Sequence, residues 1–224
     1  MSCLNDAVIS PSATVTIKAT ENNVNDGGKT ITVNHPDGSQ IHIVGDCGGS
    51  ACDLQFAQGQ NGIVVDDGHT LGSITNLGLI GGAQAQTGVL AHGRSNINNV
   101  DNITIQGFFY GMSADFDSHI LANHVAISNS VRDELTAGYS SSLMAENASL
   151  SGSKETECNA LTSGSSTVYL VNANIKGGEH SLCALNTSTI FSYSTNITGD
   201  LPTECMGNGV IVSDTKSLSC PKNS

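Results

Sequence analysis

The sequence predicts an all-β fold: a right-handed parallel β-helix with three strands per turn and about six turns, flanked by a strand-rich N-terminal head and a small C-terminal cap. Three observations predict this fold. A repeat of about 23 residues runs through most of the chain, and repeats of fixed length in this range are typical of solenoids. Apolar and polar residues alternate within each repeat, and 25 glycines punctuate the 224 residues.

Each repeat is centred on a serine that is followed two residues later by an aliphatic residue. The serines are 23, 23, 25 and 22 residues apart: Ser95, Ser118, Ser141, Ser166 and Ser188. A second apolar residue follows, and two residues after it comes a residue suited to a left-handed turn. These turn positions are Gly107, Asn129, Gly152, Gly177 and Gly199. A weaker copy lies upstream, around His69 and Leu71.

The pattern within a repeat favours strands. In the second full copy we expect them at 110–114, 119–122 and 124–128. Helical repeats would need a 3.6-residue period and few glycines, and a leucine-rich repeat would need its run of leucines and its asparagine ladder. Stacked turns of short strands therefore remain as the predicted architecture.

The repeat defines three regions: a head at 1–60, the β-helix at 61–200 and a cap at 201–224. In the head we expect strands at 14–18, 29–33 and 40–44, with a turn at 35–38. In the cap we expect a last strand at 210–212. The two open ends of a β-helix need such covers because their strand edges would otherwise pair with other chains.

One outward-facing column is apolar. The residue directly after each Ser-x-aliphatic core should point away from the core because side chains alternate along a strand. These residues are Asn98, Leu121, Met144, Tyr169 and Phe191. Either one or two of them turn inward at a bulge or lie under a loop, or Leu121, Met144, Tyr169 and Phe191 form the interface of a homotrimer.

The charge of the chain limits its partners. The net charge is −12 with only 8 Lys and Arg residues, which argues against nucleic acid and anionic membranes. The sequence has no apolar run long enough to insert into a bilayer and no secretory apolar region after Met1, so we expect synthesis in the cytosol, either as this chain or as a longer precursor that is trimmed.

Seven cysteines leave two alternatives open. Cys158 and Cys183 occupy comparable places on successive turns, and Cys47 and Cys52 lie five residues apart. They either form disulfides in an extracellular particle or serve as buried apolar thiols. No paired Cys or His spacing typical of zinc is present, so we expect no metal site and no cofactor.

Three titratable residues are weak candidates for catalysis. Asp66, His92 and Asp115 fall at equivalent positions of three successive turns, which would place the two carboxylates near 10 Å apart. Inverting glycosidases separate their carboxylates by about 6.5–9.5 Å. The column could be a structural row of charges, or it could act in a polysaccharide hydrolase or lyase. The absence of Trp leaves few platforms for a sugar.

The densest aromatic group is Phe108, Phe109 and Tyr110, directly after a predicted turn. These rings could close the core or contact another subunit. They are also candidates for binding a receptor or a sugar.

Residues 60–200 resemble the β-helical repeat region of bacteriophage tail fibres and tailspikes. The segments that carry the resemblance are 61–72 (NGIVVDDGHTLG), 87–91 (TGVLA) and 107–114 (GFFYGMSA). The resemblance implies a homotrimer in the virion tail, extracellular in the mature particle, that is mounted on other tail proteins. It implies binding to a glycan or outer-membrane receptor on the host surface. No catalytic residue of that family can be placed on this chain, so we expect attachment without catalysis. The alternatives are a polysaccharide hydrolase or lyase and a structural virion protein of the decoration or tail-tip kind.

Overall fold

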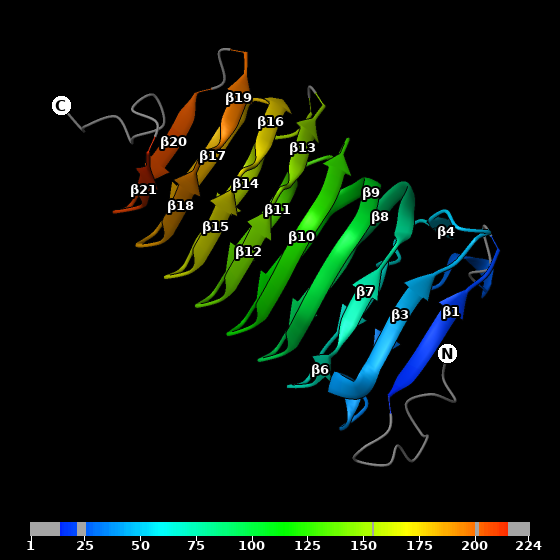
Figure 1. Ribbon diagram of the computed structural model, residues 1–224. Helices are drawn as coiled ribbons and strands as arrows, with labels where there is room; N and C mark the ends of the chain where they lie inside the picture. The colour runs from blue at the N-terminus through cyan, green and yellow to red at the C-terminus, as the bar shows by residue number, and fades with distance from the viewer. Residues whose placement is uncertain (1–13, 22–25, 154, 200–201, 215–224) are drawn as a thin grey trace.

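The structure is a computed structural model that describes residues 14–21, 26–153, 155–199 and 202–214. The protein is all-β and forms a parallel β-solenoid of about eight turns, with most of the described residues in strands. Figure 1 shows the strands side by side along the solenoid, from β1 (Val15–Ala19) at one end to β20 (Thr203–Met206) and β21 (Val210–Ser213) at the other. Two 3₁₀ turns, η1 (Asp26–Gly28) and η2 (Gly38–Gln40), lie near the N-terminal end.

Parallel pairing connects the strands into ladders that run the length of the solenoid. The first ladder contains β1, β3 (Ile41–Gly45), β6 (Thr70–Leu71), β7 (Ser73–Thr75), the start of β9 (Asn96–Asp115), the start of β10 (His119–Ser128), β12 (Ser142–Glu146), β15 (Thr167–Val171), β18 (Thr189–Tyr193) and β21. Its register aligns the repeats, because Ile120 pairs with Ile97 on one side and with Leu143 on the other.

Two further ladders run along the solenoid. The second contains β4 (Cys52–Phe56), the start of β8 (Leu77–His92), the middle of β9, the end of β10, β13 (Ser149–Gly152), β16 (Asn174–Gly177) and β19 (Asn196–Thr198). The third contains β2 (Ile31–Val33), β5 (Ile63–Val65), the ends of β8 and β9, β11 (Asp133–Gly138), β14 (Cys158–Thr162), β17 (His180–Leu185) and β20.

The pairing continues through the boundaries expected from the repeat. β2, β3 and β4 lie within 1–60 and pair in parallel with β5, β7 and β8. Beyond residue 200, β20 and β21 pair with β17 and β18 in the same way. These added coils explain why the solenoid has about eight turns where the serine repeat predicts about six. The division into head, β-helix and cap stays a prediction, and residues 1–13 and 215–224 lie outside the described residues.

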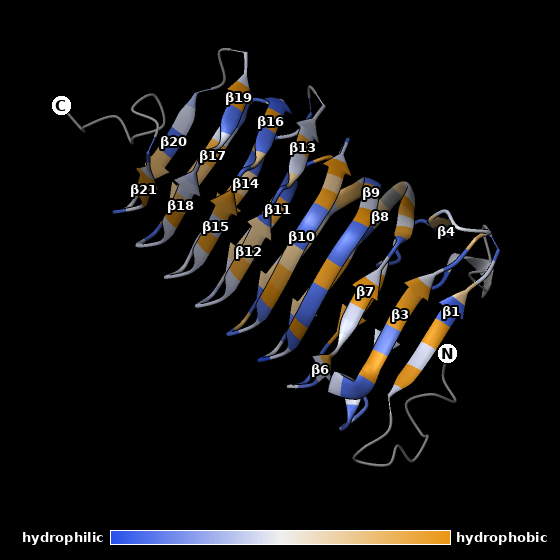
Figure 2. Ribbon diagram, in the orientation of Figure 1, coloured by the Kyte–Doolittle hydropathy of each residue, from blue (hydrophilic) through white to orange (hydrophobic). Residues whose placement is uncertain are grey.

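Alternation of apolar and polar residues places the core inside the coil. Figure 2 shows hydrophobic and hydrophilic bands alternating along strands such as β3, whose residues alternate between buried and half-buried. The aliphatic residues of the repeat stack inside the coil and are fully or almost fully buried: Ile97, Ile120, Leu143, Val168 and Ile190. Burying each such side chain contributes about 1.5–3 kcal/mol, which makes this stack the main stabilising element of the fold.

The repeated serines bind the coils to one another. The backbone N–H of Ser95 donates to the hydroxyl of Ser118 at 3.0 Å, and the N–H of Ser118 donates to Ser141 at 3.0 Å. The N–H of Ser141 donates to Ser166 at 3.2 Å. All four serines are buried, so each hydroxyl satisfies a backbone donor of the preceding coil that water does not reach.

Left-handed residues form the corners between ladders. Four of the predicted turn residues have positive φ: Gly107, Asn129, Gly177 and Gly199. Gly152 does not, so its predicted left-handed conformation is wrong. A Cβ at Gly152 would lie 2.9 Å from the backbone nitrogen of Gly178, and close backbone approach explains this glycine instead.

Candidate functional site

Asp66, His92 and Asp115 lie in one column along the edge of the third ladder. Val65 at the end of β5 pairs with Ala91, and His92 at the end of β8 pairs with Asp115 at the end of β9. The His92 Nδ1 lies 2.8 Å from an Asp66 carboxylate oxygen. His92 and Asp66 are both well exposed to solvent. The structure therefore brings the three predicted residues together on the surface.

The two carboxylates of this column differ in acidity. Burial acts to raise the pKa of Asp66, but the hydrogen bonds from His92 and the Asp67 backbone N–H act against it, and its pKa lies below the usual range. Burial raises the pKa of Asp115 despite the attraction of His92. The imidazole stands between the carboxylates, where a glycosidase would need room for its substrate. The column therefore offers a row of hydrogen-bonding groups more readily than a pair of catalytic carboxylates.

Two exposed aromatic rings adjoin this column. Phe116 is 45% exposed and Tyr139 is 60% exposed. Their rings stack with centroids 4.5 Å apart and planes 3° from parallel. The His92 ring meets Phe116 edge to face, with centroids 5.0 Å apart. We call Asp66, His92, Asp115, Phe116 and Tyr139 the corner patch. Flat rings beside carboxylates and an imidazole can stack on the apolar face of a sugar and bind its hydroxyl groups.

The backbone explains why the rings of the corner patch project outward. Each coil turns here through two successive residues with positive φ, among them Phe116 (54°) and Asp117 (58°), then Tyr139 (50°) and Ser140 (64°). Aromatic residues rarely adopt this conformation, and the cost is typically about 1–2 kcal/mol per residue. Such strained positions concentrate at binding and catalytic sites. The sequence does not reveal that Phe116 and Tyr139 project from the surface, because their exposure follows from a left-handed backbone conformation that these residue types do not predict.

The outer column of the first ladder forms an apolar stripe. Leu121 pairs with Met144, Met144 with Tyr169, and Tyr169 with Phe191. Leu121 is 52% exposed, Tyr169 is 40% exposed, and the Phe191 ring stacks on Tyr169 at 4.8 Å. Val212, also exposed, continues the column on β21. We call Leu121, Met144, Tyr169, Phe191 and Val212 the apolar stripe. No member of it turns into the core.

The aromatic run at 108–110 divides between core and surface. Phe108 is fully buried and packs against Phe56 with ring centroids 5.9 Å apart, so it cannot meet a receptor, and that part of the prediction is wrong. Phe109 and Tyr110 are half-buried, with their rings edge to face at 5.0 Å. The Arg132 guanidinium donates to the Tyr110 hydroxyl at 3.2 Å. Because Phe108 is buried, Phe109 and Tyr110 are the members of the run that a ligand could reach.

A buried acidic pair on β11 is invisible to sequence reasoning. The side chains of Asp133 and Glu134 are buried, and burial raises the pKa of Asp133 to about 7. One Asp133 oxygen accepts from the backbone N–H of Cys158 at 3.2 Å, while the other has no hydrogen-bond partner. Glu134 accepts from the hydroxyl of Ser130 at 2.5 Å, and burial raises its pKa as well. Asp133 and Glu134 are consecutive and both buried, whereas regular alternation along a strand would have exposed one of them.

For four of the cysteines, two disulfides within the described residues decide between the alternatives. Cys47 bonds to Cys52, and Cys158 bonds to Cys183 on the adjacent strand of the third ladder. These four cysteines are therefore cross-links and not buried thiols. Disulfides persist mainly outside the reducing cytosol.

Among the described residues, no helix is long and apolar enough to cross a bilayer. Comparison of the chain with protein-family models, with curated proteins and with solved structures finds no match.

Proposed function

We propose that this protein is a homotrimeric attachment protein of the tail fibre or tailspike type. It would coil as a right-handed β-helix with three strands per turn and bind a glycan or outer-membrane receptor on a host surface without catalysis. In this proposal other virion tail proteins hold it on the particle, and it is extracellular once the particle is mature.

The apolar stripe is the observation that carries the proposal. Aligned apolar side chains on the outside of a strand ladder expose surface that water solvates poorly. The remaining outer residues of β10 and β13, such as Ala126 and Ser149, are small or polar. Three copies around a common axis would each cover the stripe of a neighbour, and the straight register of the ladder suits contact along its whole length.

The corner patch supports a glycan as the receptor. It combines a stacked aromatic pair with carboxylates and an imidazole on the solvent side of the coil. Three patches on one trimer would give avidity even where each patch binds weakly, because the second and third contacts form within one complex.

The cross-links support an extracellular location. Disulfides at Cys47–Cys52 and Cys158–Cys183 suit an oxidising environment. Together with the continuous backbone ladders they would help the protein to resist unfolding outside the cell.

Binding to a panel of bacterial surface polysaccharides tests the proposal. We expect wild-type protein to bind at least one member, and Tyr139→Ala to weaken that binding about tenfold by removing one ring of the stack. Met206→Ala is the control, because Met206 is also exposed but lies on β20 and belongs to neither the corner patch nor the apolar stripe. Equal loss in both variants, or no binding by the wild type, would contradict the proposal.

A polysaccharide hydrolase or lyase is a second candidate, favoured by one observation. The different acidities of Asp66 and Asp115 around His92 are the kind of asymmetry that acid and base catalysts need. Product release from acidic polysaccharides, abolished by Asp66→Asn and by Asp115→Asn, would establish this activity. Binding without product release leaves attachment as the function.

A further inference from the structure

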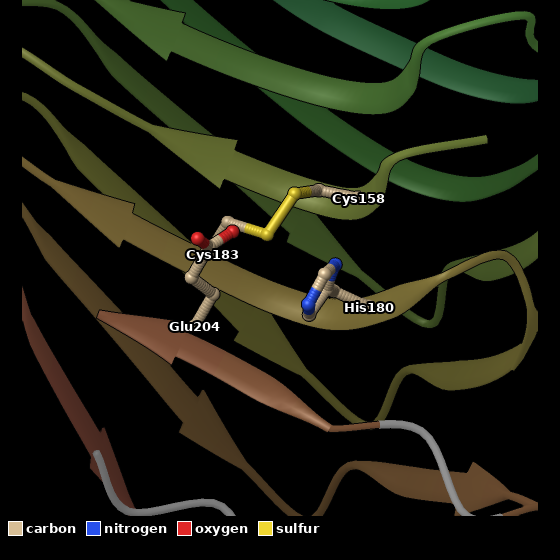
Figure 3. A group of neighbouring side chains, drawn as sticks. All are labelled: Cys158, His180, Cys183 and Glu204. Atoms are coloured by element: carbon tan, nitrogen blue, oxygen red, sulfur yellow. A yellow bond between two sulfur atoms is a disulfide. The ribbon is translucent and has the colours of Figure 1, made fainter. Parts of the chain in front are cut away.

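Four side chains from three neighbouring strands converge near the C-terminal end of the third ladder. They are Cys158 on β14, His180 and Cys183 on β17, and Glu204 on β20. One ligand atom from each lies within 4.8 Å of the others (Figure 3). Both cysteines are buried, while His180 and Glu204 are half-buried. Figure 3 shows the imidazole and the carboxylate on either side of the Cys158–Cys183 disulfide.

The ladder register produces this convergence. Cys158 pairs with His180, and Cys183 pairs with Glu204. The backbone N–H of His180 donates to the Glu157 carbonyl at 2.9 Å, and the Asn159 amide donates to the His180 carbonyl at 3.1 Å. Backbone pairing therefore holds the Cα positions of all four residues whether or not the sulfurs are bonded. The sequence gives no zinc spacing because the residues come from successive coils.

The chemistry of the group matches one class of metal ion. Two thiolates, an imidazole and a carboxylate are the ligands that zinc prefers in tetrahedral sites. With zinc bonds of about 2.0–2.3 Å, neighbouring ligand atoms of a tetrahedron stand about 3.3–3.8 Å apart. The imidazole and carboxylate atoms must therefore close by only about an ångström, whereas the two sulfurs, bonded to each other in the disulfide, must separate to about 3.8 Å after reduction. Side-chain torsions can supply both movements. We propose that this group is a redox-gated zinc site: a disulfide when oxidised, and a Cys₂-His-Glu zinc site when reduced.

Reduction of the disulfide and the zinc binding that follows conserve atoms, electrons and charge. A dithiol reductant gives two electrons and two protons to the Cys158–Cys183 bond, which yields two thiols and the disulfide of the reductant. Zn²⁺ then replaces the two thiol protons, which pass to solvent, and His180 binds as the neutral imidazole. In the oxidised form the sulfurs are bonded to each other and are no longer thiolates, so His180 and Glu204 alone hold the metal weakly.

The oxidised and the zinc-bound forms would cross-link different strands. The disulfide links β14 to β17. The zinc site would also include Glu204 and so fasten β20, the last described strand of the third ladder, to the coils beneath it. Reduction followed by metal binding would thus extend the cross-link by one coil.

Cobalt titration tests the proposal, since Co²⁺ reports tetrahedral thiolate ligation by its visible absorption. Full-length wild-type protein is reduced with a phosphine without oxygen and titrated with Co²⁺, then with Zn²⁺. We expect one equivalent of cobalt to bind with a thiolate spectrum, zinc to displace it, and unreduced protein to show no such spectrum. His180→Ala should weaken cobalt binding by more than about tenfold. Replacing a residue that only supports a metal ligand already lowers metal affinity by about 10–100-fold, and His180 would be a ligand itself.

The Cys47–Cys52 disulfide supplies a matched control. The double variant Cys47→Ser, Cys52→Ser removes a cysteine pair outside the group and should keep the cobalt spectrum, whereas Cys183→Ser should lose it. Should Cys183→Ser fail to fold by circular dichroism, His180→Ala still decides, because it keeps both sulfurs. The proposal is overturned if the reduced wild type gives no thiolate spectrum, if the Cys47 and Cys52 variant loses it, or if His180→Ala binds cobalt as tightly as the wild type.

Discussion

One hydrogen bond explains the serine in three of the five repeats. The hydroxyls of Ser118, Ser141 and Ser166 each accept from the backbone N–H of the equivalent serine one coil earlier, inside the protein. The Ser188 hydroxyl instead donates to the carbonyl oxygens of Thr162 and Leu185. The sequence predicts the positions of these serines from their spacing. It does not predict their role, because the donor lies 23 or 25 residues away and becomes a neighbour only when the coils stack.

Replacing one of these serines should destabilise the fold. Ser118→Ala leaves the buried Ser95 N–H without an acceptor, which costs about 1–3 kcal/mol of the free energy of unfolding. Ser149→Ala, at an exposed position of the second ladder, should change it by less than about 0.5 kcal/mol. Urea denaturation of both variants measures the difference. Equal stability of Ser118→Ala and wild type would show that the serine hydroxyls do not stabilise the stack.

Asp133 should make stability depend on pH. Burial raises the folded pKa of Asp133 to about 7, above its ordinary value of 3.8, so the folded state holds this proton more tightly than the unfolded chain. Its contribution therefore makes stability fall as the pH rises from about 4 to about 7, and the change ends above that pH. Asp133→Asn keeps the oxygen that accepts from the Cys158 N–H but carries no charge.

We expect Asp133→Asn to be more stable than the wild type at pH 8 by up to about 4 kcal/mol, and nearly equal to it at pH 4. Urea denaturation at both pH values measures this. Comparing the two proteins at each pH isolates the Asp133 proton together with its electrostatic coupling to Arg132, Glu157 and Glu134. A stability difference that does not change with pH would contradict the raised pKa of Asp133.

At the scale of elements, the sequence predicts the strands and the turns between the second and third ladders, but not the corners between the third and first ladders. Period-two alternation identifies β3 and β21 to within a residue or two, because the coil has a dry inside and a wet outside. The strands expected at 119–122 and 124–128 are one continuous strand, β10. The corners depend on left-handed conformations at ordinary residues such as Phe116 and Tyr139, which composition does not mark. The corner patch could therefore be predicted only in its Asp66, His92 and Asp115 column.

At the corner between the first and second ladders, the side-chain hydrogen bond of an asparagine can be tested separately from the strain of its backbone. Asn147 has φ 53°, and its amide donates to the Asn123 side chain at 2.9 Å. Asn147→Ala loses this bond and keeps the strained backbone, so it should cost about 1–2 kcal/mol of stability. Asn147→Gly loses the same bond but relaxes the backbone, so it should cost less. Thermal unfolding of the pair would refute the role of strain if Asn147→Gly were the less stable variant.

At the scale of the whole molecule, the sequence predicts the solenoid and the apolar stripe but not the zinc group. A solenoid stacks equivalent positions directly, so a column such as Leu121, Met144 and Tyr169 can be found by alignment alone. Residues that converge across strands from different positions in the repeat, such as Cys158 and Glu204, cannot be found in this way.

The apolar stripe predicts that the protein is a trimer in solution, and native mass spectrometry at micromolar concentration measures this oligomeric state most directly. We expect wild-type protein at three times the 23.0 kDa mass of the chain. Leu121→Glu should shift it to the monomer, because the stripe would then bury a charge. Ala126→Glu adds the same charge at another exposed position of β10 and should leave the trimer intact. A wild-type monomer, or equal dissociation in both variants, would contradict the trimer and the attachment function that depends on it.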